Sequence, residues 1–309
     1  MNGDLLSFVV AQTGLSRQAV IRISETARHR YKVFSIDKKR GGKRIVAQPA
    51  REVKAVQRAI VAALSSRLPV HESATAYVPG SKLINNAIPH AGQKYLLKFD
   101  FENFFPSIDD SAIRKALSGE TQNGFSQDDI LLVVGSCLWR PPGSSLLGLC
   151  IGAPSSPFLS NAVMFEFDGI VSRLARELGI SYTRFSDDVT FSGPDASSLS
   201  KMELGFRETC RELNAPKLVV NEKKRTFCSR GAAMRVTGLT LSNGGGVTVG
   251  RARKRGVRAG VDNYLRGTLD LKKVERLRGE VAFVISIEPL FRDVLIATFG
   301  DRVRDVLPS

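Results

Sequence analysis

The sequence has few of the residues that build zinc sites, disulfides and histidine-based active sites. It contains four cysteines and three histidines in 309 residues, and no two cysteines have the C-x-x-C spacing of zinc knuckles or redox pairs. The phosphate-binding motif G-x-x-x-x-G-K-[ST] and the serine-hydrolase motif G-x-S-x-G are both absent. We therefore expect reduced, mostly buried thiols, and we find no motif for P-loop or serine-hydrolase chemistry.

Long apolar runs are also missing. The first residues, MNGDLLSFVVAQTG, have no basic start and only a short apolar run. A secretory signal peptide has a basic start before its apolar run, and a membrane-spanning helix needs about 20 apolar residues. We therefore expect a cytoplasmic protein of bacterial type with no membrane partner.

Acidic residues are scarce relative to basic ones. Forty-five lysines and arginines against 30 aspartates and glutamates give a net charge of +15. Residues 28–58 hold eleven basic and two acidic residues, and residues 217–258 hold eleven and one. One such run is more often a solvated helix face. Two runs on either side of a mixed middle favour a polyanionic partner such as nucleic acid.

Hydrophobic spacing predicts an α+β fold with a helical C-terminal quarter. Helical spacing occurs at residues 16–30, 52–68, 111–117, 127–138 and 200–213, and in one long helix after the Pro/Ser-rich segment 152–157. Alternation predicts a hairpin with a basic tip around Gly41 and Gly42, and strands at 94–100, 181–193 and 234–250. From Arg251 onward the pattern is helical, with expected breaks near Gly267 and Gly279.

Three pairs of adjacent aspartates occur, and two have a structural explanation. Asp109-Asp110 and Asp128-Asp129 stand at predicted helix starts, where carboxylates cap free N–H groups. Asp187-Asp188 instead lies in a tight turn between two apolar strands. Burying like charges together is costly unless a cation is bound. This third pair is therefore either a metal site or a solvated hairpin tip.

Asp100 ends another apolar strand and supplies a third carboxylate if the two strands are neighbours in one sheet. Three carboxylates suit Mg²⁺, which prefers oxygen ligands, and Mn²⁺ could substitute for it. Two such ions about 4 Å apart can stabilise the attacking and leaving oxygens of a phosphoryl displacement. The pattern therefore favours nucleotidyl transfer.

Taken in order, five segments resemble motifs of the reverse transcriptases, and the resemblance covers nearly the whole chain. They are Lys43-Arg44, KFDFENFFPSI at 98–108, GAPSSPFLSN at 152–161, FSDD at 185–188 and NEKK at 221–224. Two further segments, NAIPH at 86–90 and VTG at 236–238, resemble signatures of the bacterial retron enzymes. The resemblance implies a right-hand polymerase, in which Asp100, Asp187 and Asp188 are catalytic and bind two metal ions.

The resemblance also implies roles for residues around these aspartates. Lys43 and Arg44 would grip the triphosphate, Phe105 would block a ribose 2′-OH, Gly152 would contact the nucleotide region, and Lys224 would protonate pyrophosphate. RNA-binding residues would lie in the C-terminal thumb, at Arg251, Arg253, Lys254, Arg255 and Arg258. His90 receives no chemical role, because a lone histidine is more often a hydrogen-bonding residue than a catalyst.

The chain departs from the family pattern at two points. Ile151 precedes Gly152 where a glutamine is usual, so a side-chain contact to the nucleotide region would be missing or replaced. Phe185-Ser186 stands where Tyr-Ala is commoner, which keeps the aromatic ring but loses a hydroxyl. Both departures would bear on fidelity or nucleotide affinity rather than on activity itself.

The resemblance implies a division into an N-terminal region with fingers at 1–95, a palm with finger insertions at 96–235 and an RNA-binding thumb at 236–309. Such an enzyme uses dNTPs to extend a guanosine 2′-OH of its own structured noncoding RNA, and makes branched RNA–DNA (msDNA). Anti-phage defence, a separately encoded effector and a host RNase H would complete the system. The alternatives are another bacterial defence reverse transcriptase of abortive-infection type, or a non-catalytic RNA-binding scaffold.

Overall fold

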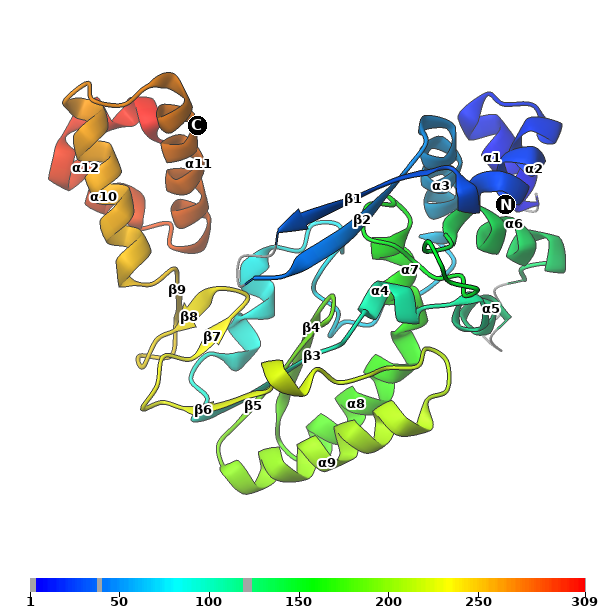
Figure 1. The fold of residues 1–309 in the computed structure, drawn as a ribbon. Helices are drawn as coiled ribbons and strands as arrows, with labels where there is room; N and C mark the ends of the chain where they lie inside the picture. Colours follow the sequence, from blue (N-terminus) through cyan, green and yellow to red (C-terminus); the bar gives the residue numbers. More distant parts are fainter. Residues whose placement is uncertain (1–3, 38–40, 119–123, 309) are drawn as a thin grey trace.

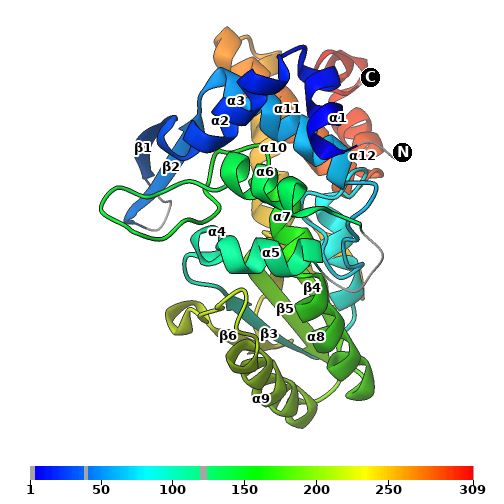
Figure 2. The same ribbon diagram turned by 90° about the vertical axis from the view of Figure 1, so that its right-hand side faces the viewer.

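The computed structural model describes residues 4–37, 41–118 and 124–308. Its N-terminal end is a layer of helices that includes α1 (Leu5–Thr13), α2 (Arg17–Thr26), α3 (Arg51–Leu64) and α6 (Gln127–Cys137). Side-chain caps start three of them, and in α6 Ser126 and Asp129 cap one another reciprocally. These helices gather at one end of the molecule (Figures 1 and 2).

A two-stranded antiparallel hairpin, β1 (Tyr31–Asp37) and β2 (Lys43–Pro49), reaches from this layer towards the centre of the molecule (Figure 1). The predicted hairpin is thus confirmed, although residues 38–40 of its basic tip lie outside the described residues. Gly41 and Gly42 both have positive φ, of 86° and 83°, which glycine adopts without strain.

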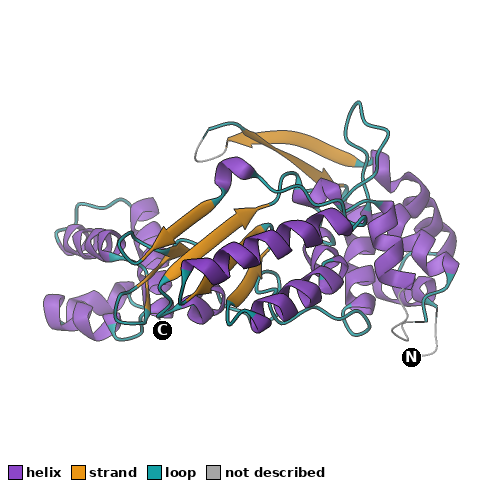
Figure 3. Cartoon of the chain, turned by 90° about the horizontal axis from the view of Figure 1, so that it is seen from below, coloured by secondary structure: helices purple, strands orange, loops and turns teal. Residues whose placement is uncertain are grey.

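The centre of the molecule is a four-stranded antiparallel sheet with the order β4-β5-β3-β6. Its strands are β3 (Tyr95–Asp100), β4 (Ser181–Phe185), β5 (Asp188–Gly193) and β6 (Thr226–Ser229). Phe99 and Phe191 point to the face covered by α9 (Ala196–Glu212), where the rings of Phe99 and Phe206 stack at 4.6 Å. Viewed from below, long helices cross in front of these strands (Figure 3). Because side chains alternate along a strand, Lys98 and Asp100 point to the other face of the sheet, away from α9.

The helix expected after residue 157 is two helices, α7 (Ser156–Val163) and α8 (Phe165–Glu177), with a break at Met164. Nearly every side of α7 is buried, whereas α8 buries only one stripe, at Phe167, Asp168, Val171 and Ala175. Since the two helices bury different faces, the chain changes direction between them, and the expectation of one long helix was wrong.

Two short helices, α4 (Phe104–Ser107) and α5 (Asp110–Ser118), follow β3. Asp109 caps α5 by accepting a hydrogen bond from the Ala112 N–H at 3.0 Å. Together with the reciprocal cap of α6, this contact confirms the structural explanation of the first two aspartate pairs.

The C-terminal part consists of a small sheet and a group of helices. The sheet joins β7 (Arg235–Val236), β8 (Leu239–Leu241) and β9 (Val247–Thr248), and it leads into α10 (Arg251–Leu265), α11 (Leu271–Ile287) and α12 (Phe291–Phe299). The three helices stand at the opposite end of the molecule from α1, α2 and α3 (Figure 1).

The predicted break near Gly267 is confirmed, but the break near Gly279 is wrong. Gly279 lies in the middle of α11, on its exposed side, where a glycine costs only about 1 kcal/mol relative to alanine. The helix ends instead before Pro289. A proline disfavours helical geometry at the preceding residue, and Glu288 has left the helix with φ −126° and ψ 82°.

Two hydrophobic cores meet at β3. Leu97 and Phe99 belong to the core shared by the N-terminal helices, the central sheet and α7 to α9. Leu96 belongs to a second core, which the small sheet and the C-terminal helices form. The two cores thus pack against opposite faces of β3. Within the described residues, no helix has the length and hydropathy needed to cross a membrane.

Candidate active site

The three aspartates singled out in the sequence come together at one end of the central sheet. Asp100, the last residue of β3, is directly opposite Asp188, the first residue of β5. Ser186 and Asp187 form the two-residue turn between β4 and β5, and the Asp187 carbonyl accepts a hydrogen bond from the Phe101 N–H at 3.2 Å. The turn therefore lies against the end of β3.

The electrostatics of this cluster favour a cation. The pKa of Asp188 is raised to about 6, mainly by burial; the charge of Lys98 opposes this rise, and the charges of Asp187 and Asp100 add to it. Burial, followed by the charge of Asp100, also raises the pKa of Asp187. Acids with raised pKa values carry negative charge that their surroundings do not fully balance. A hard divalent ion with oxygen ligands would supply the missing positive charge.

Lys224 supplies one positive charge to this cluster. It lies in a short 3₁₀ helix, Glu222–Lys224, and its amino group donates to the Asp100 carboxylate at 2.6 Å. Within the described residues, no three Asp, Glu, His or Cys side chains already converge on a single point as metal ligands do. The oxygen donors suit Mg²⁺, and an ion bound by Asp100 would compete with this ammonium group.

Three residues predicted to contact the nucleotide, Lys43, Arg44 and Gly152, lie on the hairpin or against it. Lys43 and Arg44 are exposed at the start of β2, and the positive charge of Arg44 acts to lower the pKa of Asp187. Gly152 lies against β2: a Cβ atom there would be 2.8 Å from the Ala47 carbonyl oxygen, and φ is +115°. The Ile151 carbonyl accepts from the Ala47 N–H at 2.8 Å. Gly152 therefore allows the loop before α7 to dock against the hairpin.

Phe105 is half-buried, whereas its neighbour Phe104 is 3% exposed in the core. The ring of Tyr77 lies 6.5 Å from that of Phe105, and its hydroxyl contacts the Ser186 hydroxyl at 3.4 Å. Tyr77 is 49% exposed. Phe105 and Tyr77 thus form an aromatic pair beside the turn that contains Ser186 and Asp187.

The five basic residues predicted on the thumb lie on α10 but do not share one environment. Arg253 pairs with Glu280 at 3.2 Å, and Lys254 pairs with Glu288 at 2.8 Å. For the other three, Arg251, Arg255 and Arg258, no acidic partner lies within ion-pair distance in the described part of the chain.

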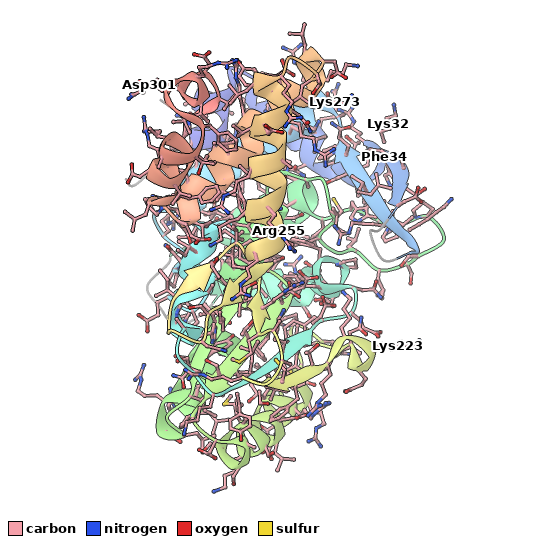
Figure 4. The ribbon with its side chains drawn as sticks, turned by 90° about the vertical axis from the view of Figure 1, so that its left-hand side faces the viewer. Lys32, Phe34, Lys223, Arg255, Lys273 and Asp301 are labelled. Atoms are coloured by element: carbon pink, nitrogen blue, oxygen red, sulfur yellow. The ribbon has the colours of Figure 1, made fainter. Side chains whose placement is uncertain are left out.

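These three arginines line a groove with a volume of about 760 Å³ between α10 and the start of α12. Residues four and three apart share one face of a helix. Arg255 lies in the half of α10 nearer the central sheet (Figure 4). We call Arg251, Arg255 and Arg258 the free stripe of α10.

The segment NAIPH has a structural role. His90 is fully buried, and its ring nitrogens lie 2.7 Å from the Ser192 hydroxyl and 2.8 Å from the Thr183 hydroxyl. Burial lowers the pKa of His90 to about 3, so the ring is neutral. Asn86 accepts from the Thr75 hydroxyl at 2.7 Å. Hydrogen bonds of Asn86 and His90 therefore connect residues 75–90 to β4 and β5. This structural role agrees with the expectation that His90 has no catalytic role.

Three residues near the site were not singled out in the sequence. They are Tyr77, Lys98 and Arg184. Lys98 precedes Asp100 by two residues, so the period of a strand would have placed both on one face. Arg184 is a charged residue inside an apolar strand, which is a recognisable anomaly. Tyr77 follows no periodic pattern, and only the folded chain brings it to the turn.

Comparison with known proteins identifies the family. A family model for reverse transcriptase (RNA-dependent DNA polymerase) matches residues 36–241. The Retron Ec83 reverse transcriptase of Escherichia coli is 36% identical over 284 residues, which cover 91% of this chain and 90% of that protein. The chain belongs to the retron reverse transcriptases. The Retron Mx65 reverse transcriptase of Myxococcus xanthus is 34% identical over 263 residues. The aligned segment covers 81% of this chain and 59% of that protein.

This retron reverse transcriptase is an RNA-directed DNA polymerase, as the sequence motifs predicted. Its fold is also shared beyond close relatives. An apo telomerase from Candida tropicalis superposes with a TM-score of 0.51 at 14% identity, over 91% of this chain and 58% of that one. The predicted α+β polymerase fold is therefore confirmed. Reverse transcriptases in general depend on divalent metal ions.

Proposed function

We propose that Asp100, Asp187 and Asp188 hold two Mg²⁺ ions and form the catalytic centre of an enzyme that makes branched RNA–DNA. The observation that supports this most directly is the meeting of three carboxylates at the ends of β3 and β5, two of them with raised pKa values. When bound, the ions would stabilise the attacking and leaving oxygens of nucleotidyl transfer. Mn²⁺ would substitute for Mg²⁺.

The neighbouring residues bind and orient the nucleotide. Lys43 and Arg44, exposed on the hairpin, contact the triphosphate of the incoming dNTP. Phe105 stands where a ribose 2′-OH would enter, and Gly152 keeps the hairpin docked near the nucleotide. Lys224 is within hydrogen-bonding distance of Asp100, and it donates a proton to the departing pyrophosphate once released from that carboxylate.

The primer is a guanosine 2′-OH in the enzyme's own structured noncoding RNA, which binds along α10. All five basic residues contribute positive charge, but the free stripe carries most of the phosphate contacts, since Arg253 and Lys254 are already paired. We keep the division into fingers (1–95), palm (96–235) and thumb (236–309) as part of this proposal.

The wider system would act in anti-phage defence in the bacterial cytoplasm. Its other components are a separately encoded effector and a host RNase H that removes template RNA. The sequence left two other functions open for this fold, DNA synthesis of abortive-infection type without a retron RNA and non-catalytic RNA binding, and membership of the retron reverse transcriptases argues against both. A scaffold has no need for three clustered carboxylates, and NAIPH and VTG favour the retron type.

Nucleic acid that purifies with the protein separates the retron function from other reverse transcription. We expect a short DNA joined to RNA through a 2′–5′ branch when the enzyme is expressed with the DNA that flanks its gene. A debranching enzyme should release the DNA from the RNA. DNA without a branch would favour the abortive-infection type, and RNA alone would favour the scaffold.

A further inference from the structure

Arg184 is the largest fully buried side chain in the described part of the protein, and it immediately precedes the turn from Phe185 to Asp188. We propose that Arg184 is a positioning residue that holds this turn, and with it Asp187 and Asp188, in the geometry that metal binding requires. The inference rests on the catalytic role proposed above for these aspartates.

The guanidinium is anchored by a buried ion pair. Arg184 Nε and Nη2 donate to the two carboxylate oxygens of Asp168 on α8, at 2.8 Å and 2.5 Å, and both side chains are 0% exposed. The Tyr182 hydroxyl donates to the same carboxylate at 2.6 Å. Apolar residues of similar volume would often stabilise a core as well as such a pair. The ion pair therefore calls for an explanation beyond stability.

The remaining nitrogen of Arg184 reaches the catalytic turn. Nη1 donates to the Ser186 carbonyl at 3.0 Å and to the Asn161 side-chain carbonyl at 3.2 Å. Ser186 has φ +61°, a left-handed conformation that is unfavourable for a residue with a side chain. The hydrogen bond to its carbonyl fixes the Ser186–Asp187 peptide and so sets the direction in which the Asp187 side chain leaves the turn.

The same network joins other parts of the site to the turn. The Asn161 amide group, on α7, donates to the Ala76 carbonyl at 2.8 Å. Backbone hydrogen bonds link Arg184 to Ser73 and Thr75 at 2.7 Å and 2.9 Å. The chain then continues to Tyr77, which contacts the Ser186 hydroxyl. Because Arg184 has no solvent exposure, it acts through the turn and not on the substrate.

The test compares Arg184→Lys with Tyr182→Phe. Lysine keeps a positive charge beside Asp168 but cannot also reach the Ser186 carbonyl with a planar fork. Tyr182→Phe removes one hydrogen bond from Asp168 and leaves the hydrogen bond between Arg184 and Ser186 intact, so it is the matched control. For each purified protein we would measure thermal unfolding, kcat, the KM for dNTP and the Mg²⁺ concentration that gives half-maximal primer extension.

We expect Arg184→Lys to raise the half-maximal Mg²⁺ concentration about 10-fold and to lower kcat about 10- to 100-fold, with little change in the KM for dNTP. Tyr182→Phe should leave these values within about twofold of the wild type. Adding Ser186→Gly should restore part of the kcat of Arg184→Lys, because glycine adopts φ +61° without strain.

Two results would overturn the proposal: an unchanged Mg²⁺ requirement in Arg184→Lys, or equal decreases of activity in both variants in proportion to their decreases in thermal stability. If Arg184→Lys does not fold, Asn161→Ala keeps the ion pair but removes a partner of Nη1. It should shift the Mg²⁺ requirement in the same direction, and an unchanged requirement would again contradict the proposal.

Asp187→Asn reports separately on the proposed function: if it retains activity, the catalytic assignment itself fails, whatever Arg184 does.

Discussion

At the scale of single residues, the site combines clustered carboxylates with one nearby ammonium group. The Asp188 carboxyl has its pKa raised to about 6, mainly by burial, whereas the ordinary value is about 4. Below about pH 4 this group is protonated in both the folded and unfolded states, and its raised pKa then favours the folded state. That contribution disappears as the pH rises through about 6. Metal binding requires the ionised form and therefore opposes protonation.

We therefore expect Mg²⁺ to stabilise the protein more at pH 8 than at pH 5.5. At a free Mg²⁺ concentration ten times the Kd, the gain is about 1.4 kcal/mol, or a few degrees in Tm. Thermal unfolding with and without Mg²⁺ at both pH values measures it. Asp188→Asn should remove most of the difference. Equal shifts at the two pH values would rule out Asp188 as a titrating ligand.

Phe105 is the residue on which sugar selectivity is expected to depend. Phe105→Ala should open space beside Tyr77 and raise the relative use of ribonucleotides by about 10- to 100-fold. The ratio of kcat/KM for dCTP and CTP measures this change. Phe105→Tyr keeps the ring and should keep the selectivity. An unaltered ratio in Phe105→Ala would show that Phe105 is not the gate.

At the scale of helices and strands, α10 carries two kinds of basic residue. Arg253 and Lys254 form ion pairs, whereas the free stripe has no acidic partner among the described residues. Replacing Arg251, Arg255 and Arg258 by glutamine should weaken binding of the cognate RNA. For each phosphate that is no longer neutralised, the slope of log K against log salt should become shallower by slightly less than one. The double variant Arg253→Gln/Lys254→Gln is the control, and it should change the slope less, because those cations are already paired within the protein. Equal changes in the two variants would contradict the role of the free stripe.

Sequence patterns located the hairpin, the central strands and most helices, because local spacing and turn chemistry determine these elements. Predictions from these patterns were wrong where tertiary contacts determine where a helix ends. The break at Met164 depends on which faces α7 and α8 bury, and the continuation of α11 through Gly279 depends on packing that offsets a weak helix former. The aspartates were predicted because strand ends are visible in sequence. The contacts of Tyr77 and Arg184 join segments about 100 residues apart, which a single sequence does not reveal.

At the scale of the whole molecule, two hydrophobic cores pack against opposite faces of β3, the strand that ends at Asp100. Residues 28–58 and 217–258, which include the hairpin and the start of α10, hold 22 of the 45 basic residues and three of the 30 acidic residues. A polymerase needs such positive charge, since the nucleotide and the nucleic-acid duplex are both polyanions. The chain thus combines two basic regions with one cluster of carboxylates.

Primer extension by Asp187→Asn, compared with the wild type on the same RNA template and with the same RNA-binding measurement, tests the central claim most directly. The substitution removes one carboxylate charge and changes the volume little. We expect incorporation of dNTPs to fall by at least about 1000-fold, with the Kd for RNA changed less than about twofold. Incorporation at the wild-type rate would contradict the assignment of Asp100, Asp187 and Asp188 as the metal-binding catalytic centre.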